Sequence, residues 1–297
     1  MKQAIIDIGS NSMRVTVYEI DKATFRILFK EKIMAGLAGY VENKILSPEG
    51  IECAYTGLLK FKGILESLNI DHVAVFATAS LRNIKNTTEA VSAIKATTGY
   101  DVEIISGEEE AFFGYTGALQ DVKLLNGAFI DIGGASTEVV PFEKGAVLAA
   151  TSFPVGSLSL YKDCVKKILP GDGSLKRLKK VISSEIRKQN TFIFEKRSPL
   201  VCVGGTSRAV LNIAKKLYAL PSGCHTVSKA QLDHLCSKLY QSDRKAIDIV
   251  LKLEPARIHT IIPGIMILQH IFHLFDADEM VVSKYGVREG YLCQKII

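Results

Sequence analysis

The sequence lacks the features that mark membrane-spanning, disulfide-bonded or zinc-binding proteins. No apolar run approaches the roughly 20 residues that a helix needs to cross a bilayer, and no basic-then-apolar leader opens the chain. The six cysteines are scattered and include no Cys-x-x-Cys pair, which favours reduced, mostly buried thiols. We therefore expect a cytoplasmic protein with no membrane partner.

The sequence also has no constellation typical of covalent catalysis or of nucleic-acid recognition. Its six histidines show no metal-ligand spacing with Asp or Cys, and no Ser-His-Asp or Cys-His arrangement stands out. No helix-turn-helix, RNA-binding or zinc-finger pattern is found, so nucleic acid is not an expected partner.

Charge is unevenly distributed, although the net value is only +6. Residues 174–197 contain eight Lys or Arg but only two Glu, and most of them fall in an expected helix over 174–194. This basic stretch is either a solvated helix face or a surface that attracts a long polyanion.

The length and composition are those of an ordinary globular protein with two domains. The chain has 297 residues, 47% of them hydrophobic and 23% charged. The order of expected strands and helices suggests an N-terminal lobe over 1–124, which the C-terminal helix at 286–297 rejoins, and a second lobe over 125–285. The first lobe should contain a helix that Ser47 caps, with Pro48 in its first turn. The second lobe should contain a strand over 145–152 and a helix over 255–275.

Two similar segments lie 124 positions apart and form the most informative feature of the chain. Each has an apolar strand that ends in Asp (Asp7, Asp131), a tight turn that begins with Gly (Gly9, Gly133), and a returning strand. Such a hairpin can present backbone N–H groups and small hydroxyls to an anion, beside a carboxylate that can hold a metal. The duplication predicts two facing lobes that grip a phosphoanhydride. The alternative is that the glycines serve only to form the turns.

Phosphoanhydride hydrolysis requires an anion cradle, neutralisation of charge, and a group that positions water. Arg82 follows an apolar strand at its carboxyl end, where open α/β sheets bind ligands. Its planar donor fork fits phosphate oxygens, although a structural ion pair is the alternative. The cradle residues would be Gly9, Ser10, Asn11, Gly133, Gly134, Ala135 and Ser136.

Carboxylates supply the remaining candidates. Asp131, Glu138 and Asp7 are hard oxygen ligands of the kind that Mg²⁺ prefers. Asp131 ends an apolar strand, where an unpaired carboxylate would be costly, whereas Glu138 could be an exposed strand residue. The sequence alone leaves that choice open.

Three successive glutamates begin the helix expected after Ser106. Ser106 and Glu109 have the spacing of a capping box, and acidic residues in a first helical turn favour the helix dipole. Glu108 and Glu109 are therefore interpreted as structural. Glu110 is one residue further along, so it is the candidate that orients or deprotonates the attacking water.

Six motifs resemble those of the Ppx/GppA phosphatase family, which comprises exopolyphosphatases and guanosine pentaphosphate phosphohydrolases. The resemblance spans nearly the whole chain and implies an α/β fold of the actin-like ATPase superfold, with two ribonuclease-H-like lobes around a central cleft. The motifs are Asp7-Ile-Gly-Ser-Asn-Ser12, Thr78-Ala-Ser-Leu-Arg-Asn83, Ser106-Gly-Glu-Glu-Glu-Ala111, Asp131-Ile-Gly-Gly-Ala-Ser-Thr-Glu138, Gly204-Gly-Thr206 and Arg288-Glu-Gly290.

The resemblance implies Mg²⁺-dependent release of orthophosphate from inorganic polyphosphate or guanosine pentaphosphate, and a family that often dimerises. Glu110 would then be the catalytic acid or base, and Asp131 and Glu138 the metal ligands. Phosphate would be held by Ser10, Asn11, Arg82 and the turn at Gly133 and Gly134. The superfold holds a nucleoside near the position of Gly204, Gly205 and Thr206.

The chain departs from the family pattern in three places. Ala135 replaces a glycine of the second turn, Lys284 and Tyr285 stand where a polar residue is common, and the chain stops at Ile297 without the added helical domains of long members. A short two-lobe member should handle short chains or nucleotides better than long polyphosphate. Two alternatives stay open: a kinase or ATPase of the same superfold, and a non-hydrolytic sensor of guanosine tetra- or pentaphosphate.

Overall fold

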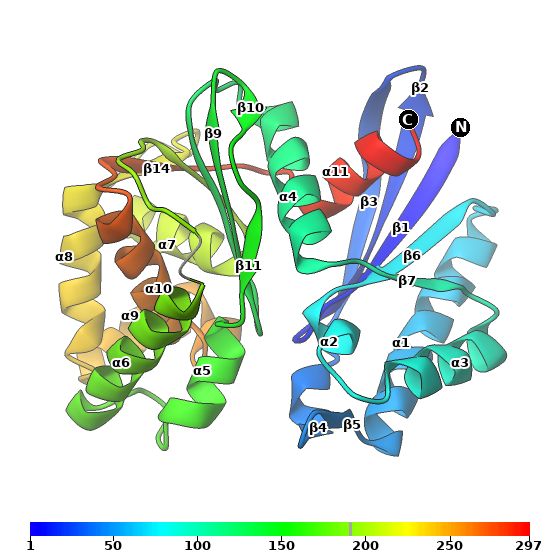
Figure 1. The fold of residues 1–297 in the computed structure, drawn as a ribbon, viewed down its shortest axis with the longest axis horizontal. Helices are drawn as coiled ribbons and strands as arrows, with labels where there is room; N and C mark the ends of the chain where they lie inside the picture. Colours follow the sequence, from blue (N-terminus) through cyan, green and yellow to red (C-terminus); the bar gives the residue numbers. More distant parts are fainter. Residues whose placement is uncertain (190–191) are drawn as a thin grey trace. The chain divides into compact units, whose positions relative to one another are not determined.

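The computed structural model describes residues 1–189 and 192–297, which form two compact units (Figure 1). Unit 1 comprises Met1–Glu110 and Tyr291–Ile297, and unit 2 comprises Ala111–Gly290. The division differs from the expected boundary after residue 124, because it falls inside α4 (Gly107–Asp121). From Ala111 onwards, the buried side of this helix packs against the sheet of unit 2.

The sheet of unit 1 has five strands in the order β3-β2-β1-β6-β7. The first three pair antiparallel, and β6 and β7 run parallel to β1. This is the ribonuclease-H-like arrangement that the family resemblance implies. The strands are β1 (Lys2–Ile8), β2 (Met13–Asp21), β3 (Thr24–Ile33), β6 (Val73–Ala77) and β7 (Val102–Ile104).

Helices cover the sheet of unit 1 with apolar side chains. The apolar faces of α1 (Pro48–Ser67) and α3 (Thr87–Thr98) form one core with β1 and β2. Ser47 caps α1 as its spacing predicts, since its side chain accepts a hydrogen bond from the N–H of Gly50 at 3.2 Å. Smaller elements complete the unit: η1 (Leu37–Tyr40), β4 (Val41–Glu42), β5 (Ile45–Leu46), α2 (Ala79–Arg82) and the end of α11 (Val287–Lys295).

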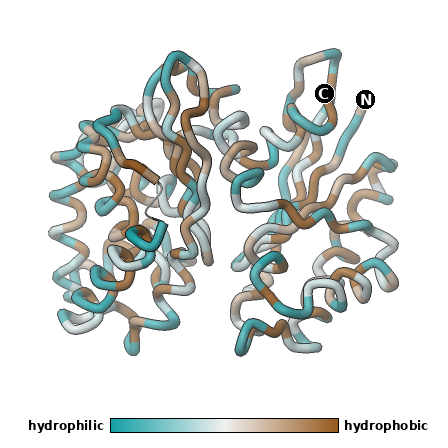
Figure 2. Tube along the Cα trace, in the orientation of Figure 1, coloured by the Kyte–Doolittle hydropathy of each residue, from teal (hydrophilic) through white to brown (hydrophobic). Residues whose placement is uncertain are grey.

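Unit 2 repeats the plan around a seven-stranded sheet. Its order is β10-β9-β8-β12-β14-β13, with β11 also paired to β9, and β8, β12 and β14 are parallel. Hydrophobic segments run along the strands of both sheets (Figure 2). The strands are β8 (Gly127–Ile132), β9 (Thr137–Glu143), β10 (Ala146–Val147), β11 (Thr151–Phe153), β12 (Leu200–Val203), β13 (Thr226–Ser228) and β14 (Glu279–Val282).

One strand expected over 145–152 is split into β10 and β11, and Pro141 on the neighbouring strand β9 explains the break. The carbonyl of Pro141 accepts a hydrogen bond from the N–H of Leu148, so this edge of Pro141 faces the split strand. In an antiparallel pair, Pro141 would also donate its N–H to the carbonyl of Leu148, but proline has no N–H. The hydrogen-bond ladder is therefore interrupted at this pair.

The helices of unit 2 depart from the expected bounds mainly in two places. The helix expected over 174–194 is α6 (Asp172–Lys188), and residues 190–191 of that expectation lie outside the described part of the chain. The helix expected over 255–275 is divided into η2 (Pro255–Arg257) and α10 (Ile261–Leu274). The others are α5 (Ser157–Cys164), α7 (Gly204–Leu217), α8 (Lys229–Tyr240) and α9 (Arg244–Leu253).

Among the described residues, no helix combines the length and apolar character needed to cross a membrane. All six cysteines are free thiols, and Cys164, Cys202 and Cys236 are buried while the other three are partly exposed.

Candidate active site

The two hairpin turns share their backbone geometry. The N–H of Gly9 donates to the carbonyl of Ser12 at 3.2 Å, and the N–H of Gly133 donates to that of Ser136 at 2.9 Å. A Cβ on either glycine would lie 3.0–3.1 Å from the same carbonyl oxygen, so the turns have little room for a side chain. The duplication seen in the sequence therefore extends to hydrogen bonding.

In unit 2, the carbonyls of the turn point towards α5. Those of Gly133 and Gly134 accept backbone hydrogen bonds of 2.9–3.0 Å from the first residues of that helix. Because the carbonyl and the following N–H of a trans peptide point in opposite directions, the N–H groups of Gly134 and Ala135 point away from α5. This is the orientation that a phosphate cradle needs, and Ala135 still supplies its N–H despite its methyl group.

The turn of unit 1 is also held through its carbonyls, but one position further along and by a different partner. The carbonyls of Ser10 and Asn11 accept hydrogen bonds from the N–H groups of Ala38 and Gly36, at 2.9 and 3.0 Å. The N–H groups of Asn11 and the following Ser12 therefore point away from the 36–39 loop. The Ser10 side chain is buried, as is that of Ser136 in unit 2.

Three neighbouring parallel strands of unit 1 end at one edge of the sheet and lead into the candidate residues. The hairpin turn follows β1, Arg82 follows β6, and Glu110 follows β7. The hydroxyl of Ser80 donates to the carbonyl of Ile8 at 2.5 Å and ties the segment after β6 to the end of β1. The carboxyl ends of parallel strands are the usual ligand-binding edge of α/β sheets.

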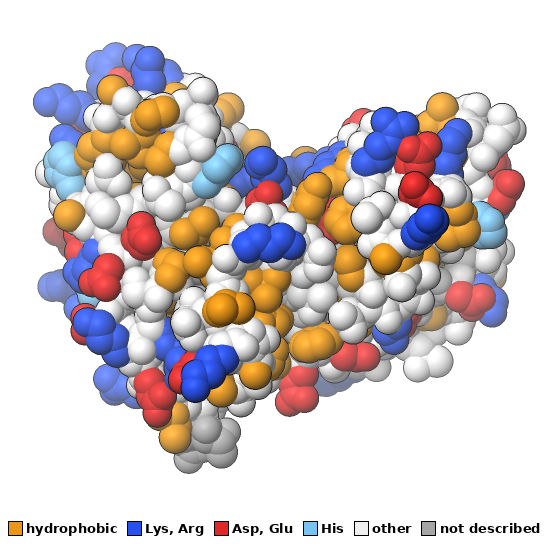
Figure 3. Space-filling model, turned by 90° about the horizontal axis from the view of Figure 1, so that it is seen from above, with side chains coloured by type: hydrophobic (Ala, Val, Ile, Leu, Met, Phe, Trp, Pro, Cys, Tyr) orange, Lys and Arg blue, Asp and Glu red, His pale blue; other side chains and the backbone are white. Residues whose placement is uncertain are grey.

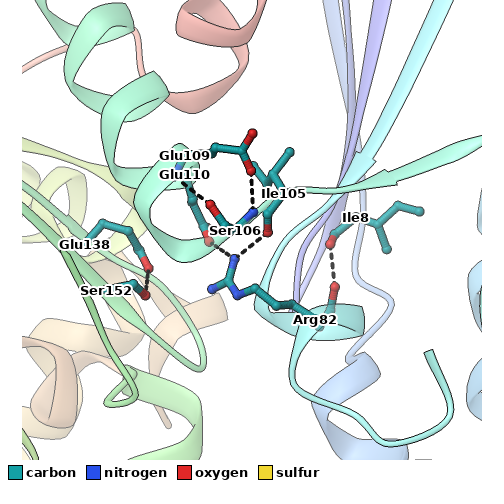
Figure 4. A network of polar contacts seen from close by, with 9 residues as sticks. Ile8, Arg82, Ile105, Ser106, Glu109, Glu110, Glu138 and Ser152 are labelled. Carbon is teal, nitrogen blue, oxygen red and sulfur yellow. Dashed lines mark hydrogen bonds and ion pairs between the residues drawn. The ribbon is translucent and has the colours of Figure 1, made fainter. Parts of the chain in front are cut away.

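Arg82 and Glu110 form an ion pair at this edge (Figure 4). The Nη1 of Arg82 donates to the Oε2 of Glu110 at 2.8 Å and to the carbonyl of Ile105 at 3.0 Å. The two side chains are only 17% and 11% exposed. Arg82 is therefore an ion-pair partner, as the structural alternative predicted, but its partner is the candidate catalytic carboxylate itself.

The preceding glutamate has the predicted structural role. The N–H of Ser106 donates to the carboxylate of Glu109 at 2.8 Å, and the hydroxyl of Ser106 accepts from the N–H of Glu109 at 3.1 Å. The hydrogen bond from the N–H of Ser106 to the carboxylate lowers the pKa of Glu109. The capping box is confirmed, and it fixes the first turn of α4, which carries Glu110.

In unit 2, Asp131 and Glu138 lie directly opposite each other on β8 and β9. Cross-strand partners project to the same face of a sheet, and like charges placed in this way destabilise it. Glu138 is 1% exposed, so it is not the exposed strand residue that the sequence allowed. The hydroxyl of Ser152 donates to its carboxylate at 2.7 Å (Figure 4). A cation held by the two carboxylates would offset their repulsion.

The equivalent pair in unit 1 has a different charge. Asp7 lies opposite Arg14 in the register of β1 and β2, at the positions that Asp131 and Glu138 occupy in the second hairpin. In this hairpin, the guanidinium of Arg14 therefore supplies a positive charge at the position opposite Asp7. The contrast favours the second hairpin over Asp7 as the metal-binding one. No group of three or more His, Cys, Asp or Glu suited to a metal occurs in residues 1–189 and 192–297.

The turn between β12 and α7 lies against Asp131. Gly204 has a φ of +82°, and a Cβ there would be 2.3 Å from the Oδ1 of Asp131. A Cβ on Gly205 would collide with the guanidinium of Arg257, which therefore lies over the start of α7. Thr206 is buried against Gly264 of α10, a position that favours packing over contact with a ligand.

The structure adds residues that the sequence reasoning did not single out. Ser152 reaches Glu138 only because β11 pairs with β9, and Arg257 reaches Gly205 from η2, more than 50 positions along the chain. Gly156 lies so close to the second turn that a Cβ would be 2.4 Å from the backbone of Gly134. No motif in the sequence signals these three contacts.

The motif Arg288-Glu-Gly290 near the end of the chain has a structural role. Glu289 is 1% exposed and accepts a hydrogen bond from the N–H of Gly286 at 2.9 Å. A Cβ on Gly290 would lie 1.7 Å from the carbonyl of Phe113, and one on Gly117 would lie 2.0 Å from that of Gly286. Glycines thus allow α11 to contact α4 closely.

The two ribonuclease-H-like units, each with a phosphate-type hairpin, define an α/β protein of the actin-like ATPase superfold. The chain belongs to the Ppx/GppA phosphatase family, whose model matches residues 16–296. A solved structure of the Aquifex aeolicus family member is 25% identical and superposes with a TM-score of 0.80, covering 100% of this chain and 97% of that one.

Two bacterial relatives carry more specific names. A Haemophilus influenzae protein provisionally named an exopolyphosphatase is 27% identical over 97% of this chain and 90% of its own length. A Vibrio vulnificus protein named guanosine-5'-triphosphate,3'-diphosphate pyrophosphatase is 30% identical over 97% of this chain. The chain spans only 58% of the length of the Vibrio protein.

Proposed function

We propose that this protein is a hydrolase that releases orthophosphate from a terminal phosphoanhydride bond of inorganic polyphosphate or of guanosine pentaphosphate. Membership of a phosphatase family supports a hydrolase. The names of the relatives supply the two candidate substrates. Both substrates present the same terminal phosphate to the enzyme, so one set of residues can act on either.

The observation that carries the proposal is the Arg82–Glu110 pair at the carboxyl edge of the sheet in unit 1. A guanidinium fork suits phosphate oxygens, and a carboxylate in a largely buried position suits the orientation of water. The two groups share one hydrogen bond of 2.8 Å. A phosphate group that binds Arg82 therefore competes with Glu110 for the guanidinium.

That competition suggests how the reaction is limited to bound substrate. When the terminal phosphate takes hydrogen bonds from Arg82, Glu110 can accept one from a water aligned with the phosphorus atom. The hairpin N–H groups hold the oxygens whose charge rises in the transition state. Glu110 either orients this water or takes its proton.

We also propose that Mg²⁺ is required and that Asp131 and Glu138 hold it. Mg²⁺ is usually bound by one or two carboxylates together with waters and substrate phosphates, so a pair of carboxylates is a sufficient protein contribution. When bound, the cation supplies charge neutralisation to the phosphate. Ser152 fixes the rotamer of Glu138 through its 2.7 Å hydrogen bond.

The test is phosphate release from polyphosphate, guanosine pentaphosphate and ATP at equal concentrations of terminal phosphate, with and without Mg²⁺. Glu110→Gln should lower kcat by roughly 10²–10⁴-fold, the usual contribution of general acid–base catalysis. Glu108→Gln, an exposed neighbour on the same helix turn, is the matched control and should be unchanged. If a substrate binds but no phosphate is released from any of the three, the hydrolase proposal is overturned and the sensor alternative is favoured. Release from ATP alone would favour the ATPase alternative.

A further inference from the structure

Helix α6 carries a continuous row of donor side chains on the side away from the core. Its buried residues are Leu178, Ile182 and Ile186. The opposite side lines a surface groove with Lys176, Lys179, Lys180, Ser183, Ser184, Arg187 and Lys188. These positions follow the i, i+3, i+4 spacing of one helical face, and at 1.5 Å per residue the row is about 18 Å long.

The row concentrates positive charge on one side of α6. Between Asp172 and the end of α6, the only acidic residue is Glu185, which forms an ion pair with Lys188. On the right-hand part of the face drawn in Figure 3, acidic and basic side chains lie side by side. Like charges four residues apart, as at Lys176 and Lys180, destabilise a helix. An anionic ligand would relieve this repulsion.

Helices α6 and α8 both pack on α10 (Figure 1). A cavity of about 310 Å³ lined by residues of these three helices opens beside the row. Lys176 and Lys179 line both the cavity and the groove on α6. The apolar part of the lining comes from Leu175, Ile182 and Met266. The volume is at the lower end for small-molecule sites, which suits a ligand the size of a nucleoside.

Polar groups in the cavity are fixed by hydrogen bonds. The hydroxyl of Tyr240 donates to the Oε1 of Gln269 at 3.0 Å, and the Nε2 of Gln269 donates to Asp233 at 2.8 Å. Asp233 is held in turn by Lys229 at 2.7 Å. The network sets the orientation of the Gln269 amide, which is a group that can recognise the edge of a base.

Two histidines of α10, His270 and His273, complete the lining, and the groups that act on His270 are cationic. Burial lowers the pKa of His270, and the nearby His273, Arg187 and Lys179 lower it further. A neutral imidazole offers one donor and one acceptor. The cations that surround it are the groups that an anion would bind.

We infer that the cavity between α6, α8 and α10 is a binding site for a nucleotide with two or more phosphates, with the base in the cavity and the phosphates on Lys176, Lys179 and Arg187. None of these residues belongs to the hairpins, to the β12–α7 turn or to the Arg82–Glu110 pair. The site is therefore additional to the proposed hydrolytic one and does not depend on it. Inorganic polyphosphate would use the row on α6 but not the apolar lining.

Photolabelling of the full chain with 8-azidoguanosine triphosphate tests the inference, because peptide mapping separates this site from any nucleotide bound elsewhere. Label is expected in the peptides of α8 and α10. The triple variant Lys176→Ala/Lys179→Ala/Arg187→Ala should bind roughly tenfold more weakly at this position, from three exposed charge contacts. Lys216→Ala, an exposed lysine on α7 of the same unit, is the matched control and should label normally.

A second variant tests the cavity without changing the charge. Met266→Trp fills part of the apolar lining and should reduce labelling of α10 while the row on α6 keeps its charge. Unfolding curves for each variant show whether a lost label reflects a lost fold. Three results would each overturn the inference. The first is label confined to other segments, and the second is equal labelling of the triple variant and the parent protein. The third is competition by inorganic triphosphate that is as effective as competition by GTP.

Discussion

Substitution of Gly204 by Ala should destabilise unit 2 and disturb the proposed metal site together. Gly204 has a φ of +82°, a conformation that costs an L-residue roughly 1–2 kcal/mol. Its new Cβ would lie 2.3 Å from the Oδ1 of Asp131, so that carboxylate or the backbone must move by about an ångström to restore ordinary contact. Overpacking of this kind costs about 1–3 kcal/mol more.

The expected loss of about 2–5 kcal/mol corresponds to a fall in unfolding temperature of roughly 5–15 °C for a unit of this size. Thermal unfolding measures it directly. Gly173→Ala is the matched control, because nothing lies within 4 Å of its Cβ position and its φ is not positive. That control should unfold within about 2 °C of the parent protein.

The same variant tests the role proposed for Asp131. If this carboxylate helps to hold Mg²⁺, its displacement should raise the half-saturating Mg²⁺ concentration for phosphate release by roughly 10–100-fold, as for other displaced metal-site groups. An unfolding temperature equal to that of the control, together with an unchanged Mg²⁺ requirement, would refute the reasoning. Loss of stability with an unchanged Mg²⁺ requirement would refute the metal role alone.

Three further predictions concern Ser152, Glu109 and Gly290. Ser152→Ala removes the hydrogen bond to Glu138, so the Mg²⁺ requirement should rise about tenfold while kcat at saturating Mg²⁺ changes little; an unchanged titration would count against it. The pKa of Glu109 is lowered in the folded protein, so the capping hydrogen bond to its ionised carboxylate stabilises the fold above the ordinary pKa of glutamate. That stabilisation is lost as the pH falls through the lowered pKa of Glu109. Glu109→Gln should therefore be less stable near neutrality, and its unfolding midpoint should approach that of the parent only as the pH falls through the lowered pKa of Glu109. Gly290→Ala forces a Cβ to 1.7 Å from the carbonyl of Phe113, so it should fail to fold or lose several kcal/mol, which unfolding curves would show.

The duplicated hairpins share one backbone framework but carry different charge pairs. In both, Gly closes the turn through the same hydrogen bond, so the backbone geometry is shared. The residue opposite the strand-end Asp is Arg14 in unit 1 and Glu138 in unit 2. The first pair combines opposite charges, whereas the second places two carboxyl groups opposite each other. A single cross-strand position thus separates the electrostatic character of the two hairpins.

Much of the fold could be predicted from the sequence because the signals were local. Apolar strands, glycine turns and the Ser47 cap with Pro48 depend on residues that are neighbours in the chain, and their bounds agree with the structure to within a few positions. The division of the 145–152 strand was missed because its cause, Pro141, acts from the neighbouring strand. The boundary between the units fell inside α4 because a helix can begin on one core and continue on another.

The sequence by itself determined the family, the duplicated hairpins and the capping role of Glu109, since each depends on residue type and spacing along the chain. Only the tertiary structure decided which groups meet. It paired Arg82 with Glu110, buried Glu138 beside Ser152, laid Asp131 against Gly204 and opened a cavity beside α6. These contacts join residues from different strands and helices, and their distances depend on how the sheets and helices pack rather than on sequence spacing.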